Sequence, residues 1–273
     1  MNKRLTLLLV SYDGYSDMWP TFFECKEKFW PDCPYPIVLA NNEKDFAASN
    51  LKVLNCGKEA QWSTRTRMAL ENIDTKYVMF LLEDLFISDK VKTEHIEGAL
   101  DLMDKDGIDY YKIKSFSSID TVLYKKIPYL HVIPQNLRYG ISLQAAIWDK
   151  DFFKQKIGEG NYNPWYFEAE RNRESSENSE SEKMVGLYDN RNILNICHMV
   201  VQGKYLPNAV KYMLAKDIQI DTTQRSVMPL KQLCNYKFKL FVLSIARRIP
   251  VLYKIVKSVG FQSVSEKNSQ KCS

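Results

Sequence analysis

The most telling run in this sequence reads Tyr77-Val78-Met79-Phe80-Leu81-Leu82-Glu83-Asp84-Leu85-Phe86. Six apolar residues in a row predict a buried strand, and this strand runs directly into two adjacent carboxylates. Two like charges at the end of a buried strand repel each other unless water, a cation or a polar ligand relieves them. Because ligands of open α/β sheets bind at strand ends, the pair Glu83 and Asp84 is the first candidate for chemistry.

Strands and helices alternate on both sides of this run. Before it, the pattern predicts strands at residues 5–10, 35–40 and 51–54 and helices at 18–29 and 64–73. After it, the pattern predicts a helix at 94–104, strands at 110–113 and 142–148, and a short helix at 150–157. Units this short favour a Rossmann-like α/β fold, with a mostly parallel central sheet flanked by helices.

One internal stretch has no apolar residue at all, namely residues 170–183. Without an apolar face a segment has little to bury, so we expect a solvated, mobile loop there. The loop would begin just after Glu168, a position that suits a lid over a site.

Composition and charge limit the kinds of partner that the sequence suggests. The chain has 273 residues with 45% hydrophobic content, which is enough for one large domain or one domain with an appendage. The net charge of +5 is concentrated at the end of the chain, because nine Lys or Arg stand against the single acid Glu266 from residue 226 onward. A nucleic-acid groove would be expected to make the body basic, so the sequence indicates no nucleic-acid partner.

The cysteines and histidines show no metal-binding spacing. Six cysteines are scattered without a CxxC pair, which fits reduced thiols in a cytoplasm better than a disulfide framework or a zinc site. The three histidines, His95, His131 and His198, lie far apart in the sequence, and we assign them no metal role. The apolar run at residues 5–10 is too short for a signal peptide and is interpreted as the first strand.

Several segments, in this order along the chain, resemble GT-A-fold (family-2-like) glycosyltransferases of bacterial surface-polysaccharide gene clusters. They are Ser11-Tyr12-Asp13 after the first strand, Trp62–Leu70 with Ile73 and Tyr77, Leu82-Glu83-Asp84, and finally Ile141–Trp148 with Asn163–Glu168. The resemblance covers roughly residues 5–210, and the order of the segments is more specific than any one of them.

The resemblance implies an inverting glycosyltransferase that moves a sugar from a nucleotide-diphosphate donor to a polysaccharide or lipid-linked oligosaccharide. It implies that Asp84 holds a divalent cation, Mn²⁺ or Mg²⁺, and that Glu168 is the catalytic base. It assigns the nucleotide sugar to Ser11, Tyr12, Asp13, Asn41, Arg65, Arg67 and Glu83, and the acceptor or sugar ring to Trp148 and Trp165. Each of these side chains also has a plainer interpretation: Trp148 suits a core equally well, and the two arginines suit a helix surface.

One departure from the family keeps other functions open. The metal motif of such enzymes has two carboxylates flanking one position, whereas Leu82 occupies the first of these positions here. Metal-independent transfer therefore stays open, as does a non-catalytic, membrane-associated scaffold that binds sugar nucleotides. A nucleotidyltransferase is the other enzyme alternative, but residues 11–15 lack the Gly-rich, basic loop expected after its first strand.

The sequence predicts a glycosyltransferase domain at residues 1–225 and a basic amphipathic tail at 226–273. Between Tyr236 and Val259, apolar residues alternate with lysines and arginines, and Pro250 is expected to divide this stretch into two helices. Such helices can lie on an anionic membrane surface with their cations toward the head groups. We therefore expect a cytoplasmic protein that is peripheral on the inner face of the cell membrane.

Overall fold

The computed structural model describes residues 4–115, 119 and 121–246. The chain divides into two compact units, Met1–His198 and Met199–Ser273. The boundary expected at 225/226 falls inside the second of these units, and the predicted site residues all belong to the first.

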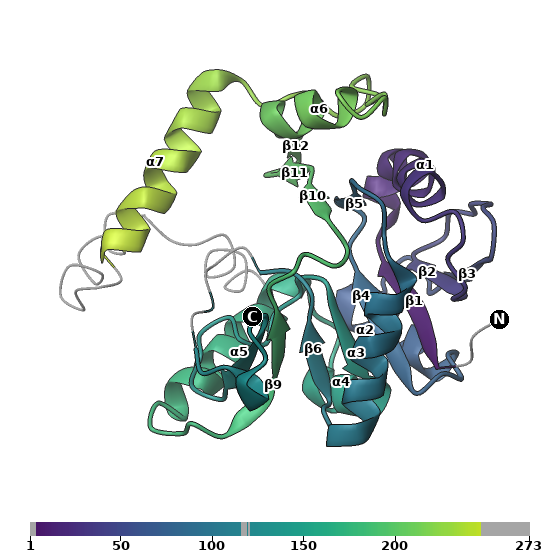
Figure 1. Cartoon of the computed structure of the whole chain (residues 1–273). Coiled ribbons are helices and arrows are strands. Elements are labelled where there is room, and N and C mark those ends of the chain that lie inside the picture. Colours follow the sequence, from purple (N-terminus) through teal and green to yellow (C-terminus); the bar gives the residue numbers. More distant parts are fainter. Residues whose placement is uncertain (1–3, 116–118, 120, 247–273) are drawn as a thin grey trace. The chain divides into compact units, whose positions relative to one another are not determined.

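The first unit is built on one eight-stranded sheet in the order β3-β2-β1-β4-β8-β6-β9-β7 (Figure 1). Its strands are β1 (Leu5–Val10), β2 (Ile37–Asn41), β3 (Leu51–Asn55), β4 (Tyr77–Leu81), β6 (Tyr110–Lys112), β7 (Leu130–Pro134), β8 (Ala146–Asp149) and β9 (Met184–Asp189). The first four are mutually parallel, and β8 runs antiparallel between β4 and β6. Strands β6 and β9 are parallel, and β7 is antiparallel to β9. The predicted Rossmann-like class, with a mostly parallel sheet flanked by helices, is confirmed.

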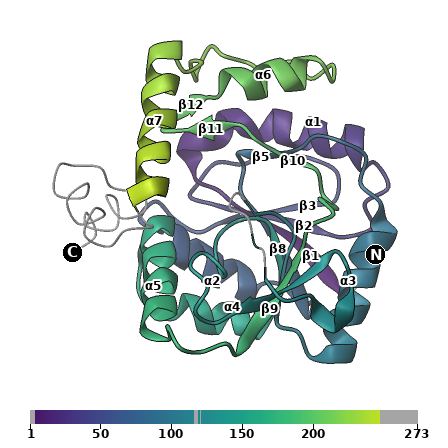
Figure 2. The same cartoon turned by 60° about the vertical axis from the view of Figure 1, so that its left-hand side comes forward.

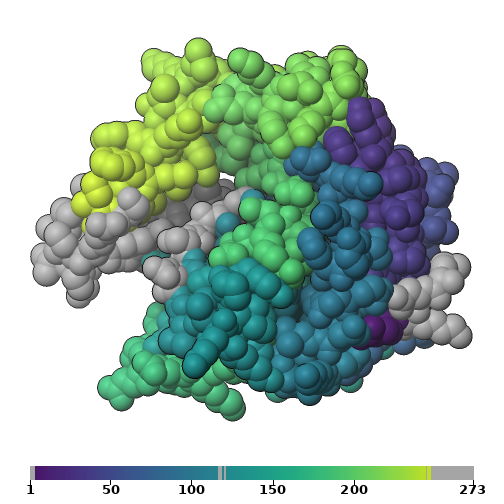
Figure 3. Space-filling model, viewed as in Figure 1, coloured from purple at the N-terminus to yellow at the C-terminus, as the bar shows by residue number. Residues whose placement is uncertain are grey.

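Helices cover both faces of this sheet. They are η1 (Asp13–Met18), α1 (Trp19–Phe29), α2 (Trp62–Glu71), α3 (Thr93–Asp106), α4 (Lys150–Ile157) and α5 (Pro164–Glu177). Helices α1 and α3 form the surface on the side seen in Figures 1 and 3. Helices α2 and α4 lie side by side against the opposite face (Figure 2).

Alternation along the strands explains this two-sided core. On β1, Leu8 and Val10 join the apolar cluster under α2 and α4, together with Trp62 and Phe153. The intervening side chain Leu9 is equally buried but belongs to the other face. Strands buried on both faces read as mostly apolar runs, which is why β1, β2 and β4 were visible in the sequence, whereas β3 is only partly buried.

Trp148 belongs to this core, so its predicted contact with a sugar is wrong. Its side chain is fully buried, and its ring stacks on Phe153 with 4.3 Å between the ring centroids. The ring of Tyr110 packs at 4.2 Å from it. A side chain enclosed in this way has no face left for an acceptor.

The predicted mobile loop at 170–183 is also wrong, because α5 extends through Glu177. The helix begins at a strong signal, since the side chain of Asn163 accepts a hydrogen bond from the Tyr166 backbone N–H and Pro164 is the first helical residue. Its exposed face is joined by ion pairs at helical spacing, such as Arg173 with Glu170 at 2.8 Å. Residues 178–183 lie outside the helix, so a loop exists only over that part of the predicted range.

The second unit contains β11 (Val200–Val201), β12 (Lys204–Tyr205), α6 (Pro207–Leu214) and α7 (Leu230–Ala246). Helix α7 exposes apolar side chains over its length: Leu230, Phe238, Leu240, Phe241 and Ile245. Among the described residues, no helix combines the length and the apolar content needed to cross a membrane. The predicted break at Pro250 and the helix after it lie outside the described residues.

Candidate functional site

The candidate site lies at the carboxyl edge of the sheet. Ser11 follows β1, Asn41 ends β2 and Glu83 follows β4, and these three strands are parallel neighbours. The same edge continues beyond β8 to β6, because Phe80 of β4 pairs with Ala146 of β8, and Ala146 pairs with Lys112 of β6. The ends of β4 and β6 therefore lie at the same level, at the edge where open α/β sheets bind their ligands.

Ser11 and Asp13 order the loops at this edge. The buried Ser11 hydroxyl accepts a hydrogen bond of 2.8 Å from the Trp19 indole N–H, which fixes the chain as it leaves β1. The Asp13 carboxylate accepts backbone hydrogen bonds from Glu43 at 3.2 Å and Lys44 at 3.4 Å. Asp13 thereby joins the turn after β1 to the loop after β2. The Tyr12 side chain is 44% exposed at the rim of the same turn.

Two buried polar atoms at this edge have no hydrogen-bond partner within the part of the chain that the structure describes. They are the Asn41 Oδ1 acceptor and the Arg65 Nε donor. The Asn41 amide is held by its other atom, because Nδ2 donates to the Asp13 carboxylate at 3.4 Å. Burial lowers the pKa of Arg65, while the nearby charges of Glu83 and Asp13 act in the opposite direction. A buried donor and a buried acceptor left unpaired are costly, so a polar ligand that offers both partners would be stabilised here.

Arg67 is held elsewhere in this structure, and its predicted nucleotide contact stays a prediction. Its guanidinium donates to the backbone carbonyls of Gly158 and Gly160, which join α2 to the loop before α5. Two positions along a helix correspond to a rotation of about 200°, so Arg65 and Arg67 point to different sides of α2. The spacing in the sequence shows this divergence but not which of the two arginines faces the site.

Asp84 lies next to a histidine that the sequence analysis set aside. After β4 the chain turns tightly, with the Leu85 backbone N–H donating to the Leu82 carbonyl at 3.1 Å. It then forms β5 (Leu85–Ile87), which pairs antiparallel with β10 (Ile196–His198) so that Leu85 lies opposite His198. The His198 Nε2 is 3.1 Å from the Asp84 Oδ2.

No local spacing could have revealed this pair, because the two residues are 114 positions apart. Only the pairing of two three-residue strands brings them together. The described residues contain no group of three His, Cys, Asp or Glu side chains that could hold a metal ion. A carboxylate and an imidazole nevertheless fit a cation such as Mn²⁺, provided that phosphate oxygens and water complete the coordination.

Glu168 lies on the first part of α5, near the carboxyl end of β6. Its charge acts on Tyr110 and Lys112 of that strand. Two aromatic side chains at the start of the same helix, Trp165 and Tyr166, are 38% and 37% exposed. Glu168 as base and Trp165 as acceptor platform stay predictions, and both lie beside the same edge of the sheet.

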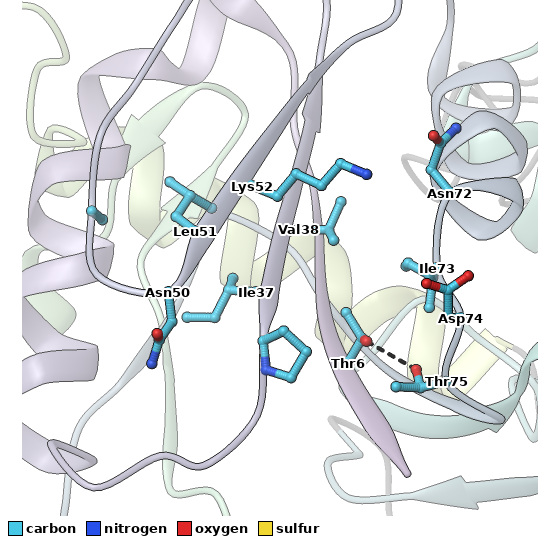
Figure 4. Close-up of a pocket in the computed structure, with 12 residues that line it drawn as sticks. Thr6, Ile37, Val38, Asn50, Leu51, Lys52, Asn72, Ile73, Asp74 and Thr75 are labelled. Atoms are coloured by element: carbon cyan, nitrogen blue, oxygen red, sulfur yellow. Dashed lines mark hydrogen bonds between the residues drawn. The ribbon is translucent and has the colours of Figure 1, made fainter. Parts of the chain in front are cut away.

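A distinct pocket of about 600 Å³ lies at the opposite edge of the sheet (Figure 4). It is lined where the parallel strands begin and where α2 ends, by residues that include Thr6, Ile37, Leu51, Lys52 and Thr75. The hydroxyl of Thr75 donates to that of Thr6 at 2.9 Å across its floor. None of the predicted site residues lines this pocket.

No protein-family model matches the chain, and no curated protein matches it in sequence. Among solved structures, it is similar to residues 1–349 of TarS from S. aureus, with 14% identity, a TM-score of 0.43, and 68% of this chain and 60% of that chain covered. It is similar to the mannosyltransferase PcManGT from Pyrobaculum calidifontis, solved with GDP-Man and Mn²⁺, with 11% identity, a TM-score of 0.37 and coverage of 59% and 48%.

A third similar structure is the 4-diphosphocytidyl-2C-methyl-D-erythritol synthase from Anaerococcus prevotii, with 9% identity, a TM-score of 0.42, and 79% of this chain and 96% of that chain covered. The chain thus spans 60% or less of the first two proteins. The similarity to these structures is too low to support an argument about this chain. The assignment below therefore stands on the geometry of the site.

Proposed function

We propose that this chain is a glycosyltransferase that takes a sugar from a nucleotide-diphosphate donor and transfers it, with inversion, to a polysaccharide or lipid-linked oligosaccharide. The observation that carries the proposal is the cluster at the carboxyl edge of the sheet. There Asn41 and Arg65 each have an unpaired buried atom, the charge of Glu83 acts on Arg65, and the next residue, Asp84, lies 3.1 Å from His198. A nucleotide offers donors and acceptors to the first group and diphosphate oxygens to the second.

The donor half of the site would work by charge compensation. Arg65 and Asn41 would bind the nucleoside, with Glu83 near the ribose and Tyr12 at the rim. Asp84 and His198 would hold a divalent cation, which when bound neutralises the charge that develops on a departing diphosphate. The mixed oxygen and nitrogen ligands favour Mn²⁺ over Mg²⁺, since Mg²⁺ prefers oxygen ligands.

The acceptor half would be supplied by α5 and β6. Glu168 would accept the proton of the acceptor hydroxyl as that oxygen attacks the anomeric carbon. Attack from the face opposite the leaving diphosphate inverts the configuration at that carbon. Trp165 is exposed at the start of α5 and would stack against a sugar ring.

Helix α7 supports a membrane-bound location for this reaction. Its exposed apolar residues alternate with the exposed cations Lys231, Lys237 and Lys239. Apolar side chains with neighbouring lysines match the surface of an anionic bilayer, where each lysine contributes about 1 kcal/mol of binding free energy. A lipid-linked acceptor would require the enzyme to work at that surface.

The test is release of nucleoside diphosphate from a panel of UDP- and GDP-sugars in the presence of Mn²⁺ and membrane extracts as acceptor source. We expect release by the wild-type protein and at least a hundredfold slower release by Asp84→Ala and by Glu168→Ala, since each removes a group that acts in the transition state. Full activity of both variants would refute the assignment. Nucleotide binding without turnover would favour the sugar-nucleotide-binding scaffold.

A further inference from the structure

Lys112 is a fully buried lysine in the last position of β6. Its ammonium donates three hydrogen bonds, to the carbonyl of Tyr139 at 2.6 Å, to the carbonyl of Gly140 at 3.2 Å and to the hydroxyl of Ser142 at 3.0 Å. Three acceptors match the three N–H groups of an ammonium, whereas a neutral amine offers only two. Burying a charge is costly unless hydrogen-bond acceptors compensate it, so a buried lysine at this position suggests a specific role.

The three acceptors all belong to one segment, residues 137–145, which we call the β7–β8 segment. This segment closes onto β6 at its other end, because the Ala145 carbonyl accepts from the backbone N–H groups of Ile113 and Lys114 at 3.0 and 3.1 Å. Gly140 lies so close to its surroundings that a Cβ there would meet the Leu137 carbonyl oxygen at 2.9 Å. The segment is therefore tightly fitted, and Lys112 attaches it to the sheet by three hydrogen bonds.

Helix α5 contacts the same segment. The Asn172 side chain accepts a hydrogen bond of 2.8 Å from the Tyr139 backbone N–H. Glu168 precedes Asn172 by four residues, so both lie on the same face of α5. The segment thus contacts both Lys112 and the helix that carries Glu168, and the charge of Glu168 acts on the ammonium.

Few other ionisable groups surround the ammonium. Tyr110 lies on the same face of β6, two positions earlier, and its hydroxyl is 3.5 Å from the Ser142 carbonyl. On the segment itself, the Arg138 guanidinium lies over the Tyr139 ring at 5.3 Å. Glu168 is the nearby carboxylate that acts on Lys112.

We infer that Lys112 is a positioning residue for Glu168: its buried ammonium fixes the β7–β8 segment, which α5 contacts through Asn172. The inference rests on the proposed function, in which Glu168 is the base. It predicts that Lys112 acts on the acceptor side of the reaction and not on the binding of the donor nucleotide.

The test is a titration of the Glu168 carboxyl by ¹³C NMR in the full chain, with its resonance assigned by its loss in Glu168→Gln. In Lys112→Met we expect the titration midpoint of Glu168 to move about one pH unit higher, because a nearby cation has been removed. We expect kcat for nucleoside diphosphate release from UDP- and GDP-sugars to fall about tenfold to a hundredfold, as for other misplaced catalytic groups. The Kd for UDP should stay within about twofold of wild type, because the donor half of the site is untouched.

Lys26→Met is the matched control, because Lys26 is also buried but lies on α1 and pairs with Glu27 at 2.9 Å. It should change neither the titration nor kcat. Lys112→Gln, which retains hydrogen-bond donors without the charge, serves if Lys112→Met does not fold. An unchanged Glu168 titration, a parallel loss of UDP binding, or failure of both Lys112 variants to fold would overturn the inference.

These outcomes are separate from the fate of the proposed function. If the wild-type protein binds no nucleotide and releases no nucleoside diphosphate, the proposed function fails. The Glu168 titration still tests whether Lys112 affects the position and the ionisation of the Glu168 carboxylate.

Discussion

Asp84 and His198 make a specific prediction about metal at the scale of single residues. If they hold the cation, Asp84→Asn and His198→Gln should each remove the part of the thermal stabilisation by UDP or GDP that depends on Mn²⁺. The thermal stabilisation that UDP or GDP gives without Mn²⁺ should remain, because it depends on the affinity for the nucleotide alone. Thermal unfolding with nucleotide, with and without Mn²⁺, measures both parts.

His131→Gln is the control for that experiment, because His131 contacts the Thr121 carbonyl and Asn190 far from Asp84 in the sheet order. It should keep the full Mn²⁺ effect. A full effect in both site variants would mean that the pair binds no metal.

Lys112 makes a second prediction at this scale, about pH and stability. Burial lowers the pKa of Lys112 from 10.5 to about 7. Below pH 7 the folded and unfolded chains both carry the charge, so the folded protein bears the full cost of burying it. As the pH rises from 7 toward 10.5, the folded chain releases the proton before the unfolded chain does, and this cost disappears.

The free energy of unfolding of wild type relative to Lys112→Met should therefore increase above pH 7, by at most about 1.4 kcal/mol per pH unit. Urea unfolding of both proteins at pH 6, 7, 8 and 9 gives the difference directly. A difference that does not change with pH would show that the lysine keeps an ordinary pKa.

Residue type alone did not determine which predicted side chains face the site. Arg65 and Arg67 are equivalent in the sequence, yet one is buried beside Glu83 and the other binds carbonyls of the loop before α5. Trp148 has the chemistry to stack on a sugar, but neighbouring aromatic rings enclose it. These outcomes depend on the direction of a helix or strand relative to its neighbours, which spacing along the chain does not contain.

At the scale of elements, α5 shows why a loop was predicted at residues that form a helix. A pattern of apolar residues was the signal used to find helices, and residues 170–177 have none. The helix is specified instead by its Asn163 cap, by Pro164 in its first position and by ion pairs along its exposed face. Strands β1, β2 and β4 were predicted because each is a short, fully buried and mostly apolar run. Strands β5 and β10 were not predicted, because they pair with each other across a long separation in sequence.

The cap provides a test of this explanation. Asn163→Ala should lower the free energy of unfolding by about 1 kcal/mol, since it removes the side-chain hydrogen bond to the Tyr166 N–H. Urea unfolding measures the change. Glu180→Ala, which lies in the turn after α5, should change stability by less than about 0.5 kcal/mol. Equal stability of both variants would contradict the helix start described here.

At the scale of the whole molecule, the sheet was predictable and the site only in part. Alternating units fixed the Rossmann-like class and located Ser11, Asn41 and Glu83 at strand ends. The partner of Asp84 was not predictable, because it depends on a long-range strand pairing. The predicted division at 225/226 follows the change in charge and stays a prediction, whereas the first compact unit ends at His198.

Helix α7 yields a prediction that belongs to the whole protein. Phe238 and Phe241 are 60% and 61% exposed, so replacing both with Asp removes apolar area and adds negative charge without disturbing a core. The full chain should float with vesicles that contain anionic phospholipid, and the Phe238→Asp/Phe241→Asp variant should stay in the soluble fraction. The control Glu180→Ala should float like wild type. Equal flotation of wild type and the double variant would show that α7 does not bind the membrane.

The central claim is that a sugar nucleotide binds where the parallel strands end, and not in the pocket where they begin. Calorimetric titration of UDP and GDP with Mn²⁺ into matched variants of the two edges tests it most directly. Arg65→Met should weaken binding at least about tenfold, since a charge-assisted contact to the nucleotide is lost, and Lys52→Met in the opposite pocket should bind like wild type. Unchanged binding by Arg65→Met together with weakened binding by Lys52→Met would contradict the account.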